Sequence, residues 1–167
     1  HLGFSSSNHM PLQRGFDSFY GYLNGYIDYW SKTYRNRLDL YNNNNIVTNK
    51  TEINTFAAHL YATKVREMLE THQSNHPSKP FFLYYSSQLM HSPIEAPLYY
   101  IERCLNPLHS HYNGSVYRNV ATYCAMNIIL DEMVYNLTCE LKQMKLDENT
   151  VIMIVSDNGG VLHIPGS

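Results

Sequence analysis

An aspartate and an asparagine, Asp157 and Asn158, directly follow a short apolar segment, Val151 to Val155, and a serine. A run rich in β-branched residues is typical of a strand buried on both faces in a parallel sheet. The two glycines that come next allow the backbone to turn, and ligands bind at the carboxyl ends of strands in open α/β sheets. Carboxylate and amide oxygens suit a hard cation such as Ca²⁺ or Mg²⁺, although Asp-Asn-Gly-Gly is also ordinary turn chemistry.

A histidine occupies a comparable position earlier in the chain. His91 follows a second apolar segment, Phe81 to Tyr85, in a loop where Pro93 disfavours helical geometry at the residue before it. Because parallel strands bring such loops to one edge of a sheet, His91, Asp157 and Asn158 are expected to line one pocket. A histidine so placed can also be structural.

Other active-site patterns are absent from the sequence. It contains no Gly-x-Ser-x-Gly elbow, no phosphate-binding glycine loop with lysine, and no His-Glu-x-x-His. His163, shortly after the glycines, is a further candidate. The paired carboxylates of Asp131 and Glu132 lie on a predicted helix and are interpreted as part of a solvated face.

Helical periodicity identifies the elements that must position these residues. One helix is predicted from Thr55 to about Thr71, with Asn54 as its N-cap, and a longer one from about Tyr117 to Lys145. Helix, strand, helix, strand is the alternation of an α/β fold with a parallel sheet. The polar stretch from Trp30 to Lys50 is expected to be an exposed excursion, with Asn42 to Asn45 as a loop tip.

The composition restricts the class of protein. With 167 residues and 44% hydrophobic content the chain can bury a core, and a net charge of −2 without a basic run argues against a nucleic-acid partner. No apolar stretch is long enough to span a bilayer. The cysteines form no Cys-x-x-Cys pair, so their disulfide state stays open. Sequons at Asn49, Asn113 and Asn136 are compatible with glycosylation in the secretory pathway.

Five segments, in order along the whole chain, resemble those of the sulfatases, and most closely the arylsulfatase B type. The resemblance implies an alkaline-phosphatase-like α/β fold with a mostly parallel central sheet flanked by helices, with residues 1–167 belonging to one catalytic domain. The segments are His1-Leu2-Gly3-Phe4, Arg14-Gly15-Phe16-Asp17-Ser18-Phe19-Tyr20-Gly21, Gly25-Tyr26-Ile27-Asp28-Tyr29, Phe81 to Pro97 with its His-x-Pro-x-x-x-Pro loop, and Ser156-Asp157-Asn158-Gly159-Gly160.

The resemblance also implies roles for individual residues. Asp157 and Asn158 would be two of the ligands of one calcium ion, and His91 would contact the sulfate of the substrate. His1 would be the histidine that works on the formylglycine, a modified cysteine whose hydrate attacks sulfur in such enzymes. The ion would polarise the sulfate oxygens, while the histidines move protons.

Several residues of the family pattern are expected outside this sequence. The Cys-x-Pro-x-Arg segment that yields formylglycine is absent, and the tandem aspartates and a lysine are expected before His1. A second active-site lysine is expected after Ser167. We therefore expect a fragment that is incomplete at both ends and inactive alone, from a lysosomal or extracellular sulfatase acting on sulfate esters, plausibly of a glycosaminoglycan or another sulfated glycan.

Two other functions are compatible with the sequence. The first is a truncated, non-catalytic product that binds a sulfated sugar or a partner subunit. The second is a phosphodiesterase or phosphatase of the same superfamily, which Asn158 disfavours because two-metal relatives tend to place histidine there.

Overall fold

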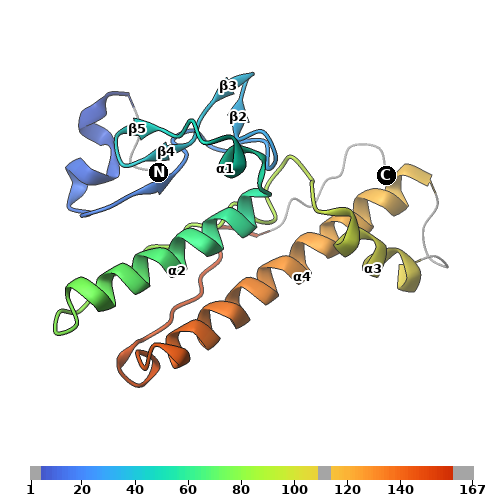
Figure 1. Ribbon diagram of the computed structural model, residues 1–167. Helices are drawn as coiled ribbons and strands as arrows, with labels where there is room; N and C mark the ends of the chain where they lie inside the picture. The colour runs from blue at the N-terminus through green and yellow to red at the C-terminus, as the bar shows by residue number, and fades with distance from the viewer. Residues whose placement is uncertain (1–4, 109–113, 160–167) are drawn as a thin grey trace.

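The computed structural model describes residues 5–108 and 114–159. Two long helices, α2 and α4, lie side by side, a shorter helix α3 packs on α4, and short strands gather near one end of this helical layer (Figure 1). The elements in chain order are η1 (Ser7–His9), η2 (Pro11–Arg14), β1 (Tyr20–Gly21), β2 (Thr33–Tyr34), β3 (Arg37–Leu38), β4 (Tyr41–Asn42), β5 (Asn45–Ile46), α1 (Lys50–Asn54), α2 (Ala57–Asn75), α3 (Leu98–Leu108), α4 (Gly114–Gln143) and η3 (Asp147–Asn149). None of the helices in this part of the chain has the length and apolar character that crossing a membrane requires.

The strands form two small antiparallel sheets. β4 pairs with β1 and β5 in one sheet, and β2 pairs with β3 in the other. The turn between β4 and β5 contains Asn43, whose φ of 55° lies in the left-handed region that asparagine tolerates. Its Oδ1 accepts a hydrogen bond from the Phe19 backbone at 2.9 Å. The loop tip predicted at Asn42 to Asn45 is therefore a hairpin turn.

The parallel sheet predicted from the sequence does not occur among the residues described. Residues 81–85 and 151–155 are extended, but neither segment pairs with a strand. In the first segment every second side chain, beginning with Phe81, packs against α2 and α4, whereas Phe82 and Tyr84 are 79% and 70% exposed. In the second segment the exposed fraction runs from 45% at Ile152 upward.

The reason for this difference is the lack of neighbours. A parallel ladder requires an adjacent strand, and burial of both faces requires a layer on each side. Among the described residues, the α2–α4 layer packs against one face of residues 81–85, and no layer covers the other face. The apolar pattern was therefore read correctly as extended backbone, but the burial of both faces that it predicted is not found among the described residues.

The helix α2 begins and ends later than its sequence pattern suggested. Asn49 caps the short helix α1 by accepting from the Thr51 N–H at 2.9 Å, so Asn54 ends α1 and does not cap α2. The first N–H of α2, at Ala57, instead donates to the Tyr29 carbonyl at 2.8 Å. The helical spacing in the sequence marks Ala57, Tyr61, Val65, Met68 and Leu69 as one apolar face, and all of these are buried in α2 except Met68, which is half-buried.

The long helix α4 is close to its prediction and faces the core with the expected residues. Of the residues that the helical period marks as the buried side, Met126, Met133 and Leu141 are buried, whereas Leu130, Leu137 and Met144 are half-buried. Asn136 on the opposite face is exposed. The helix α3 was not predicted. It follows Pro97 and buries Ile101 and Cys104.

The segment between Trp30 and Lys50 is only partly the exposed excursion that we expected. Lys32, Asp39, Leu40 and Val47 are all buried, with Lys32 and Leu40 at 0% exposure. Leu40 and Val47 contribute to the main core, together with residues of α2, α3 and α4. Leu40 and Val47 thus anchor the region of the two small sheets to the helical layer.

A disulfide joins Cys104 of α3 to Cys124 of α4, with a Cα–Cα distance of 6.1 Å, and Cys139 is free. Cross-linking residues 20 positions apart reduces the conformational entropy of the unfolded chain.

We expect the double variant Cys104→Ala/Cys124→Ala to lose about 3 kcal/mol of unfolding free energy, measured by urea unfolding under non-reducing conditions. The matched control, Cys139→Ala, should change stability by less than about 1 kcal/mol. Equal losses in the two variants would contradict a stabilising role for the disulfide.

Candidate functional site

The buried residue Tyr29 connects three distant segments of the chain. Its hydroxyl donates to the carbonyl oxygens of Gln88 at 2.7 Å and His91 at 3.1 Å, which anchors the loop that carries His91. Its backbone N–H donates to Glu95 Oε2 at 3.0 Å. Its ring stacks on Phe56, with 5.3 Å between centroids. The Gly25-Tyr26-Ile27-Asp28-Tyr29 segment therefore positions the histidine loop.

The buried side chain of Lys32 strengthens the same connection. Its ammonium donates to four carbonyl oxygens at 2.5 to 3.0 Å, those of Tyr29, Trp30, Ile53 and Thr55. Burial lowers the pKa of Lys32 to about 8, although the nearby carboxylates of Asp28 and Glu95 act in the opposite direction.

Asp28 and Glu95 form a carboxyl pair with unequal proton affinities. Burial raises the pKa of Glu95, and the adjacent Asp28 raises it further. Burial also opposes ionisation of Asp28, but hydrogen bonds from Ser31 and from the Trp30 backbone outweigh it and lower the pKa of Asp28. Glu95 therefore binds a proton more readily than Asp28 does.

The imidazole of His91 is exposed, and two contacts fix its orientation. Its Nδ1 lies 2.7 Å from the carbonyl oxygen of Ser92. Since a carbonyl can only accept, Nδ1 carries the hydrogen and Nε2 is the nitrogen left available. The ring stacks on Tyr26 at 5.5 Å between centroids and an interplanar angle of 24°. Nε2 can accept a proton, or donate to an anion once the ring is an imidazolium.

Asp157 and Asn158 lie in an exposed turn whose contacts are local. Asp157 Oδ1 accepts from the Asn158 backbone N–H at 2.8 Å, and the Asn158 side-chain amide donates to the Gly159 carbonyl at 2.9 Å. One carboxylate oxygen of Asp157 and the amide oxygen of Asn158 have no partner among the described residues. In this part of the chain, no three His, Cys, Asp or Glu side chains are close enough together to hold a metal ion.

The convergence of the predicted site residues stays a prediction. His1 and His163 lie outside the described residues. His91 is anchored through Tyr29, whereas Asp157 and Asn158 follow an exposed segment that has no such anchor among residues 5–108 and 114–159. Sequence reasoning missed Tyr29, Lys32 and Glu95 as the residues that hold the His91 loop.

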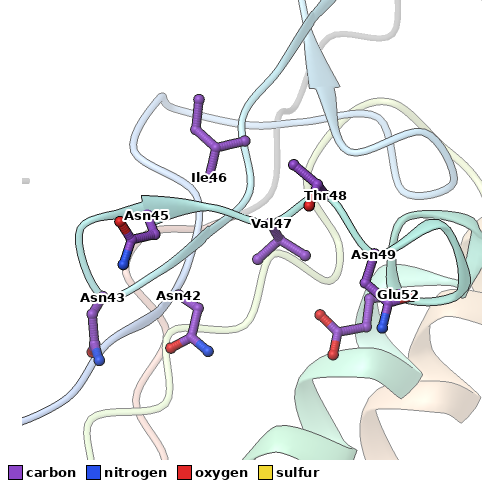
Figure 2. Close-up of a pocket in the computed structure, with 8 residues that line it drawn as sticks. All are labelled: Asn42, Asn43, Asn45, Ile46, Val47, Thr48, Asn49 and Glu52. Atoms are coloured by element: carbon purple, nitrogen blue, oxygen red, sulfur yellow. The ribbon is translucent and has the colours of Figure 1, made fainter.

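An open hollow of about 360 Å³ lies beside the β4–β5 hairpin. Figure 2 shows its lining of asparagine side chains around Val47, with Glu52 on α1 at one side. The carboxylate of Glu52 is already bound, because it accepts from the Tyr20 hydroxyl at 2.8 Å and pairs with Lys64 at 3.0 Å. The hollow therefore offers amide groups but no free charge. Asn49, the residue of the first sequon, lies at its edge (Figure 2).

Comparison with known proteins gives a consistent result along the chain. A family model described as Sulfatase matches residues 1–165. Arylsulfatase J of Mus musculus is 36% identical over 165 residues, which cover 96% of this chain and 26% of that protein. N-acetylgalactosamine-6-sulfatase of Rattus norvegicus is 24% identical and that of Canis lupus familiaris 26%, each over 97% of this chain and 29% of the relative. The chain thus spans between about a quarter and three-tenths of the length of these relatives.

The pKa of Lys32 gives a prediction for stability against pH. Because the folded-state pKa is about 8 and the ordinary value is 10.5, the unfolded chain binds more protons between these values. The contribution of Lys32 to stability should therefore rise as the pH increases from about 8 to 10.5, by on the order of 3 kcal/mol in total.

Comparison of the wild type with Lys32→Met by urea unfolding at pH 7, 8, 9 and 10 tests this. The variant removes a donor from four carbonyl oxygens, of which that of Tyr29 keeps the Ala57 N–H, so it should be less stable throughout, and its deficit should grow above pH 8. The exposed Lys79→Met is the control and should follow the wild type at every pH. A constant deficit for Lys32→Met across the series would mean that Lys32 titrates at its ordinary pKa.

Proposed function

Because this chain belongs to the sulfatase family, whose members hydrolyse sulfate esters, we propose that it forms the sulfate- and cation-binding part of a sulfuric ester hydrolase. The sulfatase family predicted from the sequence is confirmed, whereas the arylsulfatase B type remains part of the proposal. Since the relatives are much longer than the chain, the activity of the whole protein is likewise proposed.

The observation that carries the proposal is the geometry of His91. Its backbone carbonyl is fixed by Tyr29, its Nδ1 hydrogen is bound to Ser92, and Nε2 is the nitrogen left available for a ligand. As an imidazolium, His91 would donate from Nε2 to a sulfate oxygen in a charge-assisted hydrogen bond. The stacked Tyr26 ring supports the imidazole in one orientation.

The family implies a calcium ion, and the donor groups at the end of the chain fit it in kind. Asp157 and Asn158 would hold the ion through the oxygens that are not used inside the turn. When bound, calcium would polarise sulfate oxygens and offset the charge that develops there. Two protein ligands are few for an ion that usually takes about six to eight oxygens, so further ligands would come from elsewhere in the whole protein.

We further propose that residues 81–85 and 151–155 are strands of a mostly parallel central sheet in the complete fold, with residues 1–167 in one catalytic domain. The alternating burial of the first segment supports this, because the helical layer covers one face and leaves the other apolar. Such a sheet would bring His91, Asp157 and Asn158 to one edge. His1, which would act on the formylglycine, belongs to the same proposed site.

We also propose that the substrate carries its sulfate on a sugar, and that the protein is lysosomal or extracellular. Names of the relatives include N-acetylgalactosamine-6-sulfatase, and we propose a sulfated glycan as the substrate here. The disulfide supports an oxidising compartment. The exposed positions of Asn49 and Asn136 leave them open to glycans, and Asn113 lies outside the described residues.

The 167 residues alone should bind calcium weakly and hydrolyse no sulfate ester. The sequence lacks the Cys-x-Pro-x-Arg segment, and general acid–base help from histidines is worth only about 10² to 10⁴ in rate. We expect no measurable heat when Ca²⁺ is titrated into micromolar chain, and no turnover of an aryl sulfate. Tight one-to-one binding of Ca²⁺, or turnover by the isolated chain, would show that the chain carries a complete site.

The role of individual residues can be tested in the intact gene product that contains this chain, co-expressed with the formylglycine-generating enzyme. His91→Ala and Asp157→Ala should each remove most aryl-sulfate turnover, about 10²-fold or more, because each deletes a group that binds the reacting sulfate or its cation. His72→Ala is the matched control. His72 contacts the Lys79 carbonyl and Phe81, remote in sequence from the site residues, and its loss should leave turnover within about twofold.

The outcomes separate the proposal from its alternative. An inactive wild type with an intact Cys-x-Pro-x-Arg segment would favour a non-catalytic protein that binds a sulfated sugar or a partner subunit. Full activity in His91→Ala would remove His91 from the site.

A further inference from the structure

A second hollow, of about 590 Å³, lies at the β2–β3 hairpin. Arg35 and Arg37 line it together with Tyr34, Asn24 and Asp39. In the antiparallel pair Tyr34 lies directly opposite Arg37, so both side chains project from the same face of the hairpin. The hairpin turn itself has positive φ angles, 48° at Arg35 and 64° at the next residue.

The charges of the two arginines that line this hollow are not paired with a carboxylate in the described parts of the chain. Both side chains are exposed, and in the described parts of the chain neither forms an ion pair. The carboxylate that lines the same hollow, Asp39, is bound elsewhere. It accepts from the Leu23 N–H at 3.1 Å and from the backbone and side-chain amides of Asn24 at 3.0 and 2.7 Å. Asp39 therefore shapes the wall and does not pair with the arginines.

A chain of aromatic contacts connects this hollow with His91. The Arg35 guanidinium lies 5.3 Å from the centre of the Tyr34 ring. The Tyr34 ring meets Tyr26 edge to face at 5.3 Å, and Tyr26 stacks on His91 at 5.5 Å. The ring of Tyr26 is 41% exposed, so a ligand held at His91 can extend over it toward the arginines.

We propose that Arg35 and Arg37 form a subsite for a second acidic group of the substrate, a carboxylate or another sulfate on the sulfated sugar. The proposal rests on the proposed function, because it takes His91 as the contact for the scissile sulfate. Planar guanidinium groups bind carboxylate and sulfate oxygens in two-pronged hydrogen bonds, and a sugar packs against exposed tyrosine rings such as Tyr26. Tyr26 and Arg35 thereby select an acidic oligosaccharide over a small aryl sulfate.

The test compares two substrates in the intact gene product, a chondroitin sulfate tetrasaccharide and 4-methylumbelliferyl sulfate, which has no second acidic group. The ratio of their kcat/KM values should fall about tenfold in Arg35→Ala/Arg37→Ala, with the change mainly in KM for the tetrasaccharide. Arg35→Lys/Arg37→Lys keeps the charge without the planar fork and should lose less. Arg66→Ala/Arg118→Ala removes the same charge from exposed positions on α2 and α4 and should change the ratio less than twofold.

The outcomes distinguish failure of the subsite from failure of the proposed function. A ratio that is equally reduced in the Arg66/Arg118 control, or unchanged in Arg35→Ala/Arg37→Ala, overturns the subsite. If no sulfate ester is turned over by any variant, binding of the tetrasaccharide by calorimetry replaces the kinetic measurement. A tenfold weaker Kd in Arg35→Ala/Arg37→Ala, in a variant with unchanged circular dichroism, then supports the subsite, and an equal Kd overturns it.

A keratan sulfate oligosaccharide, which carries sulfates but no carboxylate, identifies which acidic group is bound.

Discussion

The burial of Tyr29 and Lys32 is the constraint on which the arrangement of this chain depends. Four carbonyl oxygens converge on one ammonium group. The backbone N–H and the hydroxyl of Tyr29 bind the segment from Gln88 to Glu95, and its carbonyl accepts from the start of α2. A buried polar group without a partner would cost on the order of 1–3 kcal/mol, so these partners cannot separate independently. The start of α2, the carboxyl pair around Glu95 and the His91 loop are therefore held as one unit.

Because of this constraint, the two parts of the candidate site differ in how firmly contacts with the rest of the chain hold them. His91 belongs to the held unit, because its carbonyl is bound by Tyr29, its Nδ1 by its neighbour and its ring by Tyr26. Asp157 and Asn158 follow residues 151–155, which are exposed and pair with no strand in the described part of the chain. Preorganisation, which determines how well a site stabilises developing charge, is therefore built into the histidine side of the site.

The sequence pattern predicted burial correctly where the side chain lies on the apolar face of one helix. It did not predict burial that depends on partners from distant parts of the chain. The apolar period of α4 placed Met126, Met133 and Leu141 in the core correctly. Burial of Lys32 could not be predicted, because lysine is almost never fully buried without specific partners and those partners are backbone carbonyls from two stretches of the chain, at Tyr29 and Trp30 and at Ile53 and Thr55. The disulfide was equally hidden, since the spacing of three cysteines does not decide which two of them pair.

Residues 81–85 and 151–155, which precede the His91 loop and the Asp157-Asn158 turn, show that an apolar sequence pattern does not by itself bury a segment. If residues 81–85 are a strand of a parallel sheet in the complete fold, as we propose, Phe82 and Tyr84 are apolar for the same reason as Phe81, because such a strand is covered on both faces. With one face covered by α2 and α4, only half of that requirement is met within the described residues. The same would hold for the oxygens of Asp157 and Asn158, which in the proposed site supply only part of a calcium shell. On the proposed function, the missing strand partners and the remaining calcium ligands would both come from other parts of the whole protein, so forming the sheet and completing the metal site would be coupled.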